Sequence, residues 1–302
     1  MNPELEIIAD YACETGECPV WHPMEQAVYW TDIPQGRLFR YDPATGEHRQ
    51  VYQGRPVGGM TVQEDGKLLL FMDRGTVALF NPTSTRSGVG INSPPTLEYV
   101  IEELPQEHET RFNDVIADPL GGVFCGTMRR GDTPGRLYRL HPNGEIEMLL
   151  EGTKTSNGMG FSPDLRKFYF TDSGPATVWA FDFDPDTAKI SNPEVIIHVD
   201  RSVEGATDGM TVDTEGNIWS ARWDGSRLVK HAPNGQELLV IPFPVKKVSS
   251  CTFGGPDYTD LYVTTAGGTD KPANGESAGS LFRLRPGPTG RPEFLSKVAP
   301  AK

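Results

Sequence analysis

Long apolar stretches are missing from this sequence. No run of about 18 apolar residues occurs, so we expect no transmembrane helix. Residues 1–10 carry neither the basic segment nor the apolar core of a signal peptide. Extended stretches with the apolar period of an amphipathic helix are absent as well. These absences predict a soluble, cytoplasmic protein built mainly from β-strands.

Basic residues and paired cysteines are also scarce. The chain has 28 Lys and Arg against 41 Asp and Glu, which gives a net charge of -13. That balance excludes the basic surface needed for nucleic acid or for an anionic membrane. The four cysteines form no C-x-x-C pair and have no metal-type spacing with histidine, so we expect free thiols in a reducing compartment.

Short apolar runs are plentiful, and they are separated by Gly, Pro, Asp and Asn, with 33 Gly and 26 Pro in total. This pattern is typical of an all-β protein. One stretch recurs: a polar or small opening residue, then small and apolar residues, then a turn. Its six copies open at Glu17, Gly58, Asn113, Asn157, Asp208 and Ser249.

Each copy is followed by a second β run and then a third, with a period of about 40–55 residues. This period is typical of the four-stranded blades of a β-propeller. We therefore predict a single all-β domain over residues 1–302, a six-bladed β-propeller of antiparallel blades around a central channel. A β-sandwich or barrel is the alternative, but a regular six-fold frame is not expected there.

The first strand of a propeller blade is innermost, so the six opening residues should converge on one mouth of the channel. Four of them carry carboxylate or amide oxygens: Glu17, Asn113, Asn157 and Asp208. Two acids held so close repel each other, and a divalent cation would relieve the repulsion. Oxygen ligands favour Ca²⁺, with Mn²⁺, Mg²⁺, Zn²⁺ or Fe²⁺ as alternatives. Taken singly, Asn157-Gly158 and Asp208-Gly209 could each be an ordinary turn.

A set of motifs stands in a fixed order from about Glu14 to Leu284. The motifs are G-E-C-P-V-W at 16–21, R-F-N-D at 111–114, G-T-M at 126–128, S-N-G at 156–158, D-G-M at 208–210 and S-C-T-F-G-G at 250–255. In this respect the chain resembles the family of gluconolactonase, regucalcin (senescence marker protein) and luciferin-regenerating enzyme. The resemblance implies a six-bladed propeller that holds one divalent metal and hydrolyses sugar lactones to aldonic acids.

The resemblance also implies site residues. The family's metal ligands fall on Glu17, Asn157 and Asp208, and its substrate contacts fall on Arg111 and Asn113. Animal members carry an acidic pair after G-T-M, where this chain has Arg129-Arg130. This departure puts the identity of the lactone in doubt and makes Arg129 a candidate substrate contact.

The predicted function is a metal-dependent lactonase acting on a small sugar lactone such as a glucono-, xylono- or arabinonolactone. Asp208 is the expected base for the attacking water, and Arg111 and Asn113 would orient hydroxyl groups. A phosphotriester hydrolase on a similar metal propeller is one alternative. A non-catalytic binding propeller, suggested by Y-W-T-D at 29–32, is another. We expect a monomer or a weak homo-oligomer.

Other polar and aromatic candidates receive weaker roles. No histidine occupies a ring position, so all six histidines are expected to be structural or solvent-facing. Trp30, Trp179 and Trp219 lie in β runs and should belong to the core, whereas Trp223 could line the sugar-binding face.

Overall fold

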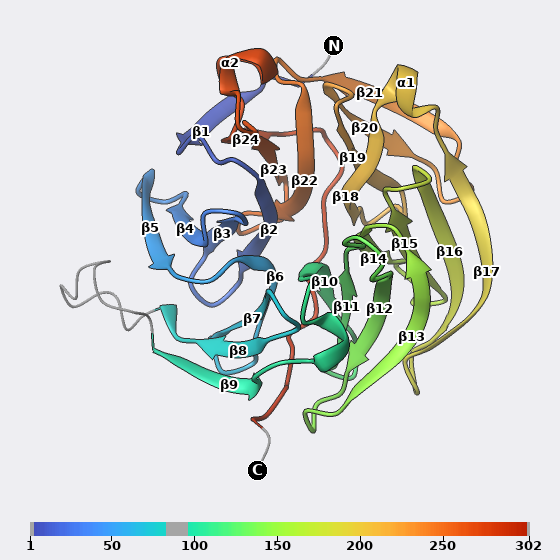
Figure 1. Ribbon diagram of the computed structural model, residues 1–302. Helices are drawn as coiled ribbons and strands as arrows, with labels where there is room; N and C mark the ends of the chain where they lie inside the picture. The colour runs from blue at the N-terminus through green and yellow to red at the C-terminus, as the bar shows by residue number, and fades with distance from the viewer. Residues whose placement is uncertain (1–2, 83–95, 301–302) are drawn as a thin grey trace.

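Six four-stranded antiparallel sheets surround a central axis (Figure 1). The computed structural model describes residues 3–82 and 96–300, and these contain 24 strands. In five of the sheets, strands that are consecutive along the chain pair in order, whereas in the sixth sheet β1 pairs with β24. The predicted six-bladed β-propeller is therefore confirmed.

The blades are numbered in chain order. Blade one consists of β2 (Gly16–His22), β3 (Ala27–Asp32), β4 (Arg37–Asp42) and β5 (Glu47–Gln53). Blade two consists of β6 (Val57–Val62), β7 (Leu68–Met72), β8 (Val77–Phe80) and β9 (Leu97–Ile101). Blade three consists of β10 (Phe112–Ala117), β11 (Val123–Thr127), β12 (Gly135–Leu140) and β13 (Ile146–Thr153).

Blade four consists of β14 (Ser156–Phe161), β15 (Lys167–Asp172), β16 (Thr177–Asp184) and β17 (Lys189–His198). Blade five consists of β18 (Ala206–Val212), β19 (Ile218–Trp223), β20 (Arg227–His231) and β21 (Glu237–Pro242). Blade six consists of β22 (Lys247–Gly254), β23 (Asp260–Ala266), β24 (Ser280–Leu284) and β1 (Glu6–Asp10). Short helices lie in connections, and those bounded within the described ranges are η2 (Pro105–Glu107), α1 (Arg201–Glu204) and α2 (Lys271–Asn274).

The ring is closed by the N-terminal strand, a feature that the sequence frame did not predict. β1 pairs antiparallel with β24, with Glu6 opposite Arg283 and Asp10 opposite Ser280. The two ends of the ring are thus joined within one sheet, so the first and last blades cannot separate without breaking that pairing.

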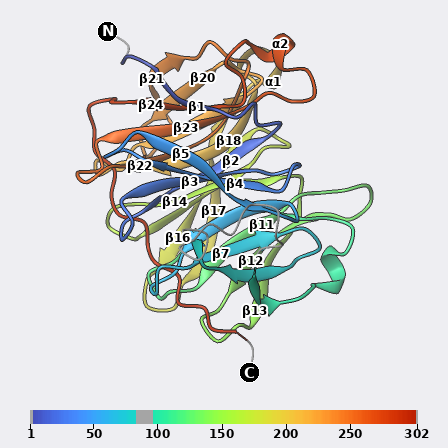
Figure 2. The ribbon, with the colours of Figure 1, turned by 90° about the vertical axis from the view of Figure 1, so that its left-hand side faces the viewer.

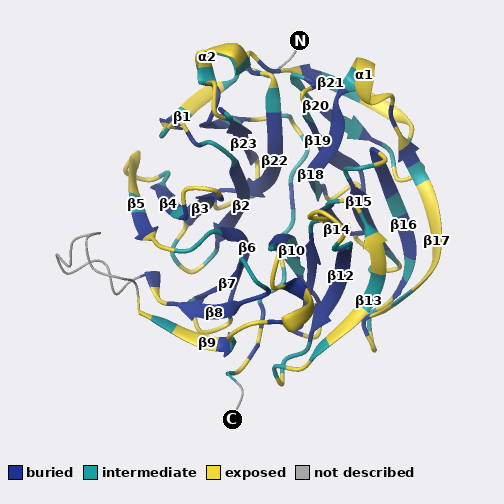
Figure 3. Ribbon diagram, in the orientation of Figure 1, coloured by how far each residue is buried: buried dark blue, intermediate teal, exposed yellow. Residues whose placement is uncertain are grey.

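The position of each strand in its blade explains its composition. Inner strands such as β2, β3 and β6 are buried along their whole length, because other blades cover both of their faces. Outer strands such as β5 and β17 are largely exposed (Figure 3). Continuous apolar or small residues therefore mark the inner strands. Polar and charged residues mark the outer ones.

The burial of individual side chains tests several smaller predictions from the sequence. The Y-W-T-D segment at 29–32 is buried within β3 and offers no surface to a partner. Trp30 and Trp219 belong to the core as predicted, but Trp179 is only half-buried. All four cysteines are free and buried. No helix in the described ranges is long and apolar enough to cross a membrane.

The two ends of the channel are built differently. At one end lie the loops between second and third strands, together with α2. Residues 285–300, here called the C-terminal strap, cross the other end of the channel. Figure 2 shows the strap as the red segment on the opposite face. The strap bonds to the last residue of β6, Val62, and to the turns between the first and second strands of blades three to six, at Gly121, Ser162, Thr214 and Tyr258.

Candidate active site

The six opening residues lie at the same end of the six innermost strands, β2, β6, β10, β14, β18 and β22. Among them Glu17, Asn113, Asn157, Asp208 and Ser249 have buried side chains. The predicted convergence on one mouth of the channel follows from this arrangement. Asn157-Gly158 and Asp208-Gly209 are strand residues and not turns.

A shift in strand pairing occurs at every one of these positions. The register between first and second strands changes between Glu17 and Val20 in blade one. The corresponding shifts in the other blades span Val57–Gly59, Phe112–Val115, Asn157–Met159, Thr207–Met210 and Val248–Ser250. An irregularity of this kind re-aims a side chain out of the regular alternation. Side chains that would otherwise enter the blade interfaces can therefore face the channel.

Two glycines allow the inner strands to approach closely. A Cβ atom on Gly158 would lie 2.7 Å from the Asp208 carbonyl oxygen and 2.5 Å from the Met210 nitrogen. A Cβ atom on Gly58 would lie 2.0 Å from the Phe112 carbonyl oxygen. Glycine at 158 thus brings β14 against β18. Ring position 58 is glycine because any side chain there would collide with the backbone of β10.

Asn157 and Asp208 are in direct contact. The Asn157 Nδ2 group donates to Asp208 Oδ1, and it also donates to Ser173 Oγ at 3.1 Å. Asn157 Oδ1 is buried and has no hydrogen-bond partner within the described residues. A buried acceptor without a donor is costly, so this oxygen is positioned for a group that the chain itself does not supply.

The carboxylates of Glu17 and Asp208 destabilise each other's charge. Burial raises the pKa of Glu17 to about 8, and the Asp114 charge adds to the effect. Burial also raises the pKa of Asp208 well above its usual value, with the negative charges of Glu17 and Asp114 acting in the same direction. Arg111 and local hydrogen bonds oppose these shifts.

Arg111 and Asn113 form one unit beside the two acids. Arg111 Nη1 donates to Asn113 Oδ1 at 2.6 Å and to the Phe112 carbonyl oxygen at 2.9 Å. Asn113 Nδ2 donates across to the Ser156 carbonyl oxygen at 2.9 Å. Within the described residues, Nε and Nη2 of Arg111 make no hydrogen bond. Asn113 therefore holds Arg111, and Arg111 keeps donors for a ligand.

These residues fit a divalent cation. Two buried carboxylates with raised pKa values and one unpartnered amide oxygen form an all-oxygen donor set, which suits a hard cation such as Ca²⁺. No three His, Cys, Asp or Glu side chains gather as a metal-binding group in the described parts of the chain. The donor set depends on Asn157 as its third member.

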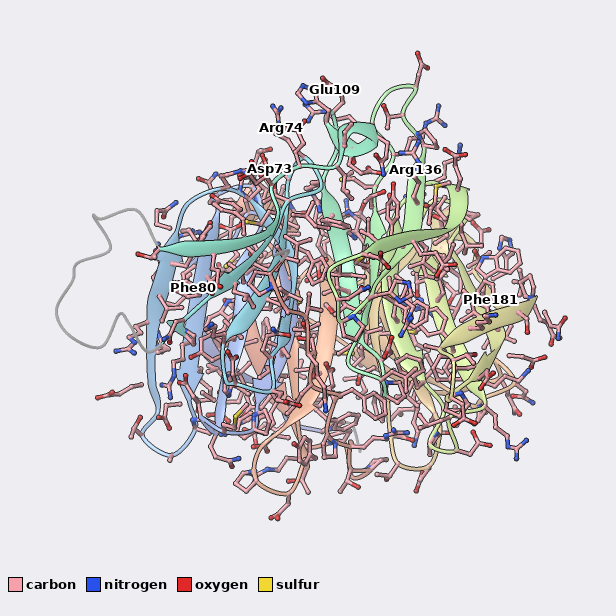
Figure 4. All side chains as sticks on the ribbon, turned by 90° about the horizontal axis from the view of Figure 1, so that it is seen from below. Asp73, Arg74, Phe80, Glu109, Arg136 and Phe181 are labelled. Carbon is pink, nitrogen blue, oxygen red and sulfur yellow. The ribbon has the colours of Figure 1, made fainter. Side chains whose placement is uncertain are left out.

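The predicted outer contact, Arg129, lies on the exposed loop between β11 and β12. Its Nε group donates to the Gly131 carbonyl oxygen at 3.0 Å, within the same loop. Segment 102–110 projects at the same end of the molecule. It is held by an ion pair between the buried Glu107 Oε1 and Arg136 Nη1, which lie 2.8 Å apart. Figure 4 shows Arg74, Glu109 and Arg136 around this projection. Arg129 therefore belongs to the rim of the mouth, apart from Glu17, Asn157 and Asp208.

Three residues near the channel escaped the sequence analysis. Ser173 contacts Asn157 from the loop after β15, and nothing in its local sequence distinguishes it from a turn serine. Asp114 follows a ring residue, and the regular alternation of a strand would direct it away from the channel. Glu293 belongs to the C-terminal strap, which lies outside the repeat and so carried no signal.

Comparison with known proteins shows which family the chain matches. The family model described as the SMP-30/Gluconolactonase/LRE-like region matches residues 15–267. Pentonolactonase XacC of Haloferax volcanii is 44% identical over 298 residues, which cover 96% of this chain and 97% of that protein.

Two solved structures are similar over nearly the whole chain. A luciferin-regenerating enzyme superposes with a TM-score of 0.87 at 28% identity, covering 98% of this chain and 100% of that one. A calcium-binding protein, regucalcin, from Agrobacterium tumefaciens superposes with a TM-score of 0.85 at 25% identity, covering 98% and 97% of the two chains.

Proposed function

Because the chain belongs to the SMP-30/gluconolactonase/LRE-like family, we propose that it is a metal-dependent lactonase that opens a sugar lactone to the aldonic acid. The 44% identical pentonolactonase extends over almost the whole of both chains, and the present chain is accordingly a lactonase. The metal dependence rests on one observation in particular, the buried Asn157 Oδ1 that lacks a donor beside Glu17 and Asp208.

Glu17, Asn157 and Asp208 would hold the cation. A divalent cation at this position would polarise the lactone carbonyl as a Lewis acid. The hydrogen bond from Asn157 Nδ2 to Asp208 Oδ1 fixes the orientation of the carboxylate. Ser173 in turn accepts from Asn157 and fixes the amide. We favour Ca²⁺ because all three donors are oxygen atoms and the regucalcin neighbour is a calcium-binding protein.

Asp208 is the proposed base. Asp208 Oδ2 makes no hydrogen bond within the described residues, so it can accept a proton from the attacking water. The cationic side chain of Arg111 lies near enough to influence both Glu17 and Asp208.

Arg111 is the proposed partner of the substrate oxygens. Its Nε and Nη2 donors would face a lactone oxygen or hydroxyl, and the positive charge would stabilise negative charge developing on oxygen. Asn113 acts through Arg111, because its amide accepts from Nη1 and is bonded across to Ser156. Loss of Asn113 would release the guanidinium from this position.

The substrate is proposed to be a lactone of a five- or six-carbon aldonic acid. The five-carbon class is favoured because the 44% identical relative is named a pentonolactonase. Arg129 and Arg130 lie on the exposed rim and would act on the outer part of the substrate. Their effect should be modest because solvent screens charge there.

An assay panel tests the proposal. The purified protein is stripped with a chelator, reloaded separately with Ca²⁺, Mn²⁺, Mg²⁺, Zn²⁺ and Fe²⁺, and assayed on five- and six-carbon aldonolactones and on phosphotriesters. The expected result is lactone hydrolysis that disappears on chelation and returns with at least one cation. Lactonase activity that survives full metal removal would overturn the metal assignment. Metal binding without turnover of any lactone would overturn the proposed reaction.

A further inference from the structure

A cavity of about 270 Å³ lies between blades three and four. Blade three contributes the end of its outer strand, residues 150–153, and blade four contributes Phe170, Asp172, Trp179, Phe181 and Pro193. Glu17, Asn157 and Asp208 do not line this space. A ligand bound there would therefore be independent of the proposed lactonase function.

The corresponding position in blade one is occupied by a cation of the chain itself. The last residue of the second strand is Asp32 in blade one and Asp172 in blade four, and each is paired with the residue before the ring position. Asp32 Oδ1 accepts from the Thr15 nitrogen at 3.0 Å, and Asp32 Oδ2 accepts from Arg37 Nη2 at 2.5 Å. The Arg37 guanidinium also lies over the buried Phe39 ring, 5.2 Å from its centroid. One oxygen of this acid is thus bonded to the backbone and the other to a guanidinium.

Blade four keeps the acid and an aromatic ring but lacks the cation. The pairing of the second and third strands puts Thr177 at the position of Arg37, and Trp179 at that of Phe39. Asp172 is 8% exposed, and its Oδ1 accepts from three backbone nitrogens of the adjoining loops at 3.0 to 3.2 Å. Among the described residues, Oδ2 shares one of these nitrogens, at 3.1 Å, and has no other donor. Oδ2 therefore has a free acceptor position where blade one has a guanidinium.

The other groups around the cavity also favour a positively charged ligand. Glu151 Oε1 is paired with Arg136 at 2.9 Å, but Arg136 is shared with Glu107, so one cation neutralises two carboxylates. The side chain of Lys154, in the adjoining loop, forms no ion pair within the described parts of the chain. Trp179 is only half-buried, so part of its ring can stack on a planar cation.

We propose that this cavity binds a small organic cation with a guanidinium head, which takes the place that Arg37 has in blade one. A guanidinium group is planar, so it can stack on Trp179 while it donates hydrogen bonds to Asp172. The cavity is larger than this group alone, and Leu150 and Phe181 line it as well. The ligand therefore carries a short alkyl chain, which packs on these apolar side chains.

Butylguanidinium is the probe, with butylurea as its neutral analogue of the same shape and butylammonium as a cation of another shape. Calorimetric titration of the wild-type protein should give one site with a dissociation constant of about 1 mM or below. Butylurea should bind at least about tenfold more weakly, because it lacks the charge. Equal affinity for butylurea would show a merely apolar groove, and equal affinity for butylammonium would exclude the guanidinium head. Either result would overturn the proposal, as would the absence of binding.

The variant Thr177→Arg introduces the cation that blade one already has. It should abolish butylguanidinium binding and raise the unfolding temperature, since Asp172 gains an ion pair. Asp172→Asn should also abolish binding, and Trp179→Leu should weaken it about tenfold. Asp182→Asn is the matched control, because it removes a carboxylate of the strand that carries Thr177, at an exposed ion pair with Lys167 outside the cavity. It should leave the affinity unchanged.

The variants also show whether the probe binds at this place. Unaltered binding in Thr177→Arg or Asp172→Asn would put the probe elsewhere on the acidic surface and would overturn the proposal. Asp172 also holds backbone nitrogens, so its variant can lose stability for that reason. In that case Thr177→Arg and Trp179→Leu decide, because both leave these backbone bonds in place.

Discussion

Two buried side-chain amides, one at each end of the channel, differ in how fully they are hydrogen-bonded. At the strap end, Gln63 Nε2 donates to the Val298 carbonyl oxygen at 2.8 Å, and Gln63 Oε1 accepts from the Val298 nitrogen at 3.1 Å. At the mouth, Asn157 Nδ2 is bonded but Asn157 Oδ1 has no donor among the described residues. Both side chains are about equally buried, at 5% and 4% exposure.

This difference in hydrogen bonding distinguishes a polar side chain that stabilises the fold from one that is available to a ligand. Gln63 is satisfied in both directions and joins the strap to blade two, so its hydrogen bonds stabilise the folded state. Asn157 leaves an acceptor unpaired next to two acids that raise each other's proton affinity. Such a cluster weakens the fold unless a ligand completes it, and unsatisfied polar groups of this kind concentrate at functional sites.

The largest expected effect comes from Asp208→Asn at the mouth. The substitution removes both the proposed base and one negative charge from the cation site. We expect kcat/KM to fall by at least about 10³-fold, equivalent to about 4 kcal/mol. The metal-free variant should be at least as stable as wild type, because repulsion with Glu17 disappears. Steady-state kinetics and chemical denaturation of the same preparations measure the two effects.

Asp213→Asn gives the contrast for this variant. Asp213 is fully buried in the turn after β18 and accepts from Trp219 Nε1 at 3.0 Å and the Asn217 nitrogen at 2.8 Å. Its substitution should lower stability and leave kcat near wild type. Near-normal kcat in Asp208→Asn would transfer the base role to Glu17.

Cation binding should stabilise the mouth and release a proton. At 100 times the dissociation constant, the gain in unfolding free energy is about 2.7 kcal/mol. Burial raises the pKa of metal-free Glu17 to about 8, so at pH 7 this carboxyl holds a proton that a cation must displace. Affinity should therefore rise from pH 6 to pH 8. Calorimetry in buffers of different ionisation enthalpy counts the released proton, and heats that do not depend on the buffer would contradict this account.

At the strap end, Gln63→Ala should lower stability without changing catalysis. The substitution leaves the backbone nitrogen and oxygen of Val298 without their partner, which costs about 2 kcal/mol. Denaturant unfolding measures the loss, and kcat/KM on the best lactone should stay within about twofold. Gln53→Ala is the matched control, because Gln53 is an exposed amide and should change stability by less than about 0.5 kcal/mol. A large drop in kcat for Gln63→Ala would show that the two ends are coupled.

The sequence was sufficient for the blades because their signal is local and repeated six times. It was insufficient for the closure of the ring, since β1 and β24 are far apart in the chain and residues 6–10 do not belong to the repeat. The strap was missed for the same reason. Its bonds to Val62 and Gly121 depend on how the six blades are arranged, and no segment of the sequence records that arrangement.

The residues of the candidate site also fall into two groups, those that the sequence repeat identifies and those that it does not. Glu17, Asn113, Asn157 and Asp208 could be selected because each opens a copy of the repeat. Asp114 could not, because strand alternation would direct it away from its neighbour Asn113. The register shift between Phe112 and Val115 removes that alternation. Asn157 Oδ1 and the contact with Ser173 depend on side-chain positions that only the three-dimensional structure gives.

The smallest expected effects are at the rim of the mouth, and they distinguish inner from outer substrate contacts. Asn113→Ala serves as the reference: it frees Arg111 and should lower kcat/KM for every lactone, by about 1–3 kcal/mol. Arg129→Ala and Arg130→Ala remove exposed charges that solvent screens. Each should change the ranking among lactones while the best rate stays within about tenfold, or about 1.4 kcal/mol. The measurement is kcat/KM for all three variants on one panel of five- and six-carbon lactones. Equal scaling of every substrate by the loop arginines would remove them from substrate selection, and an unchanged Asn113→Ala would remove the Arg111 unit from the site.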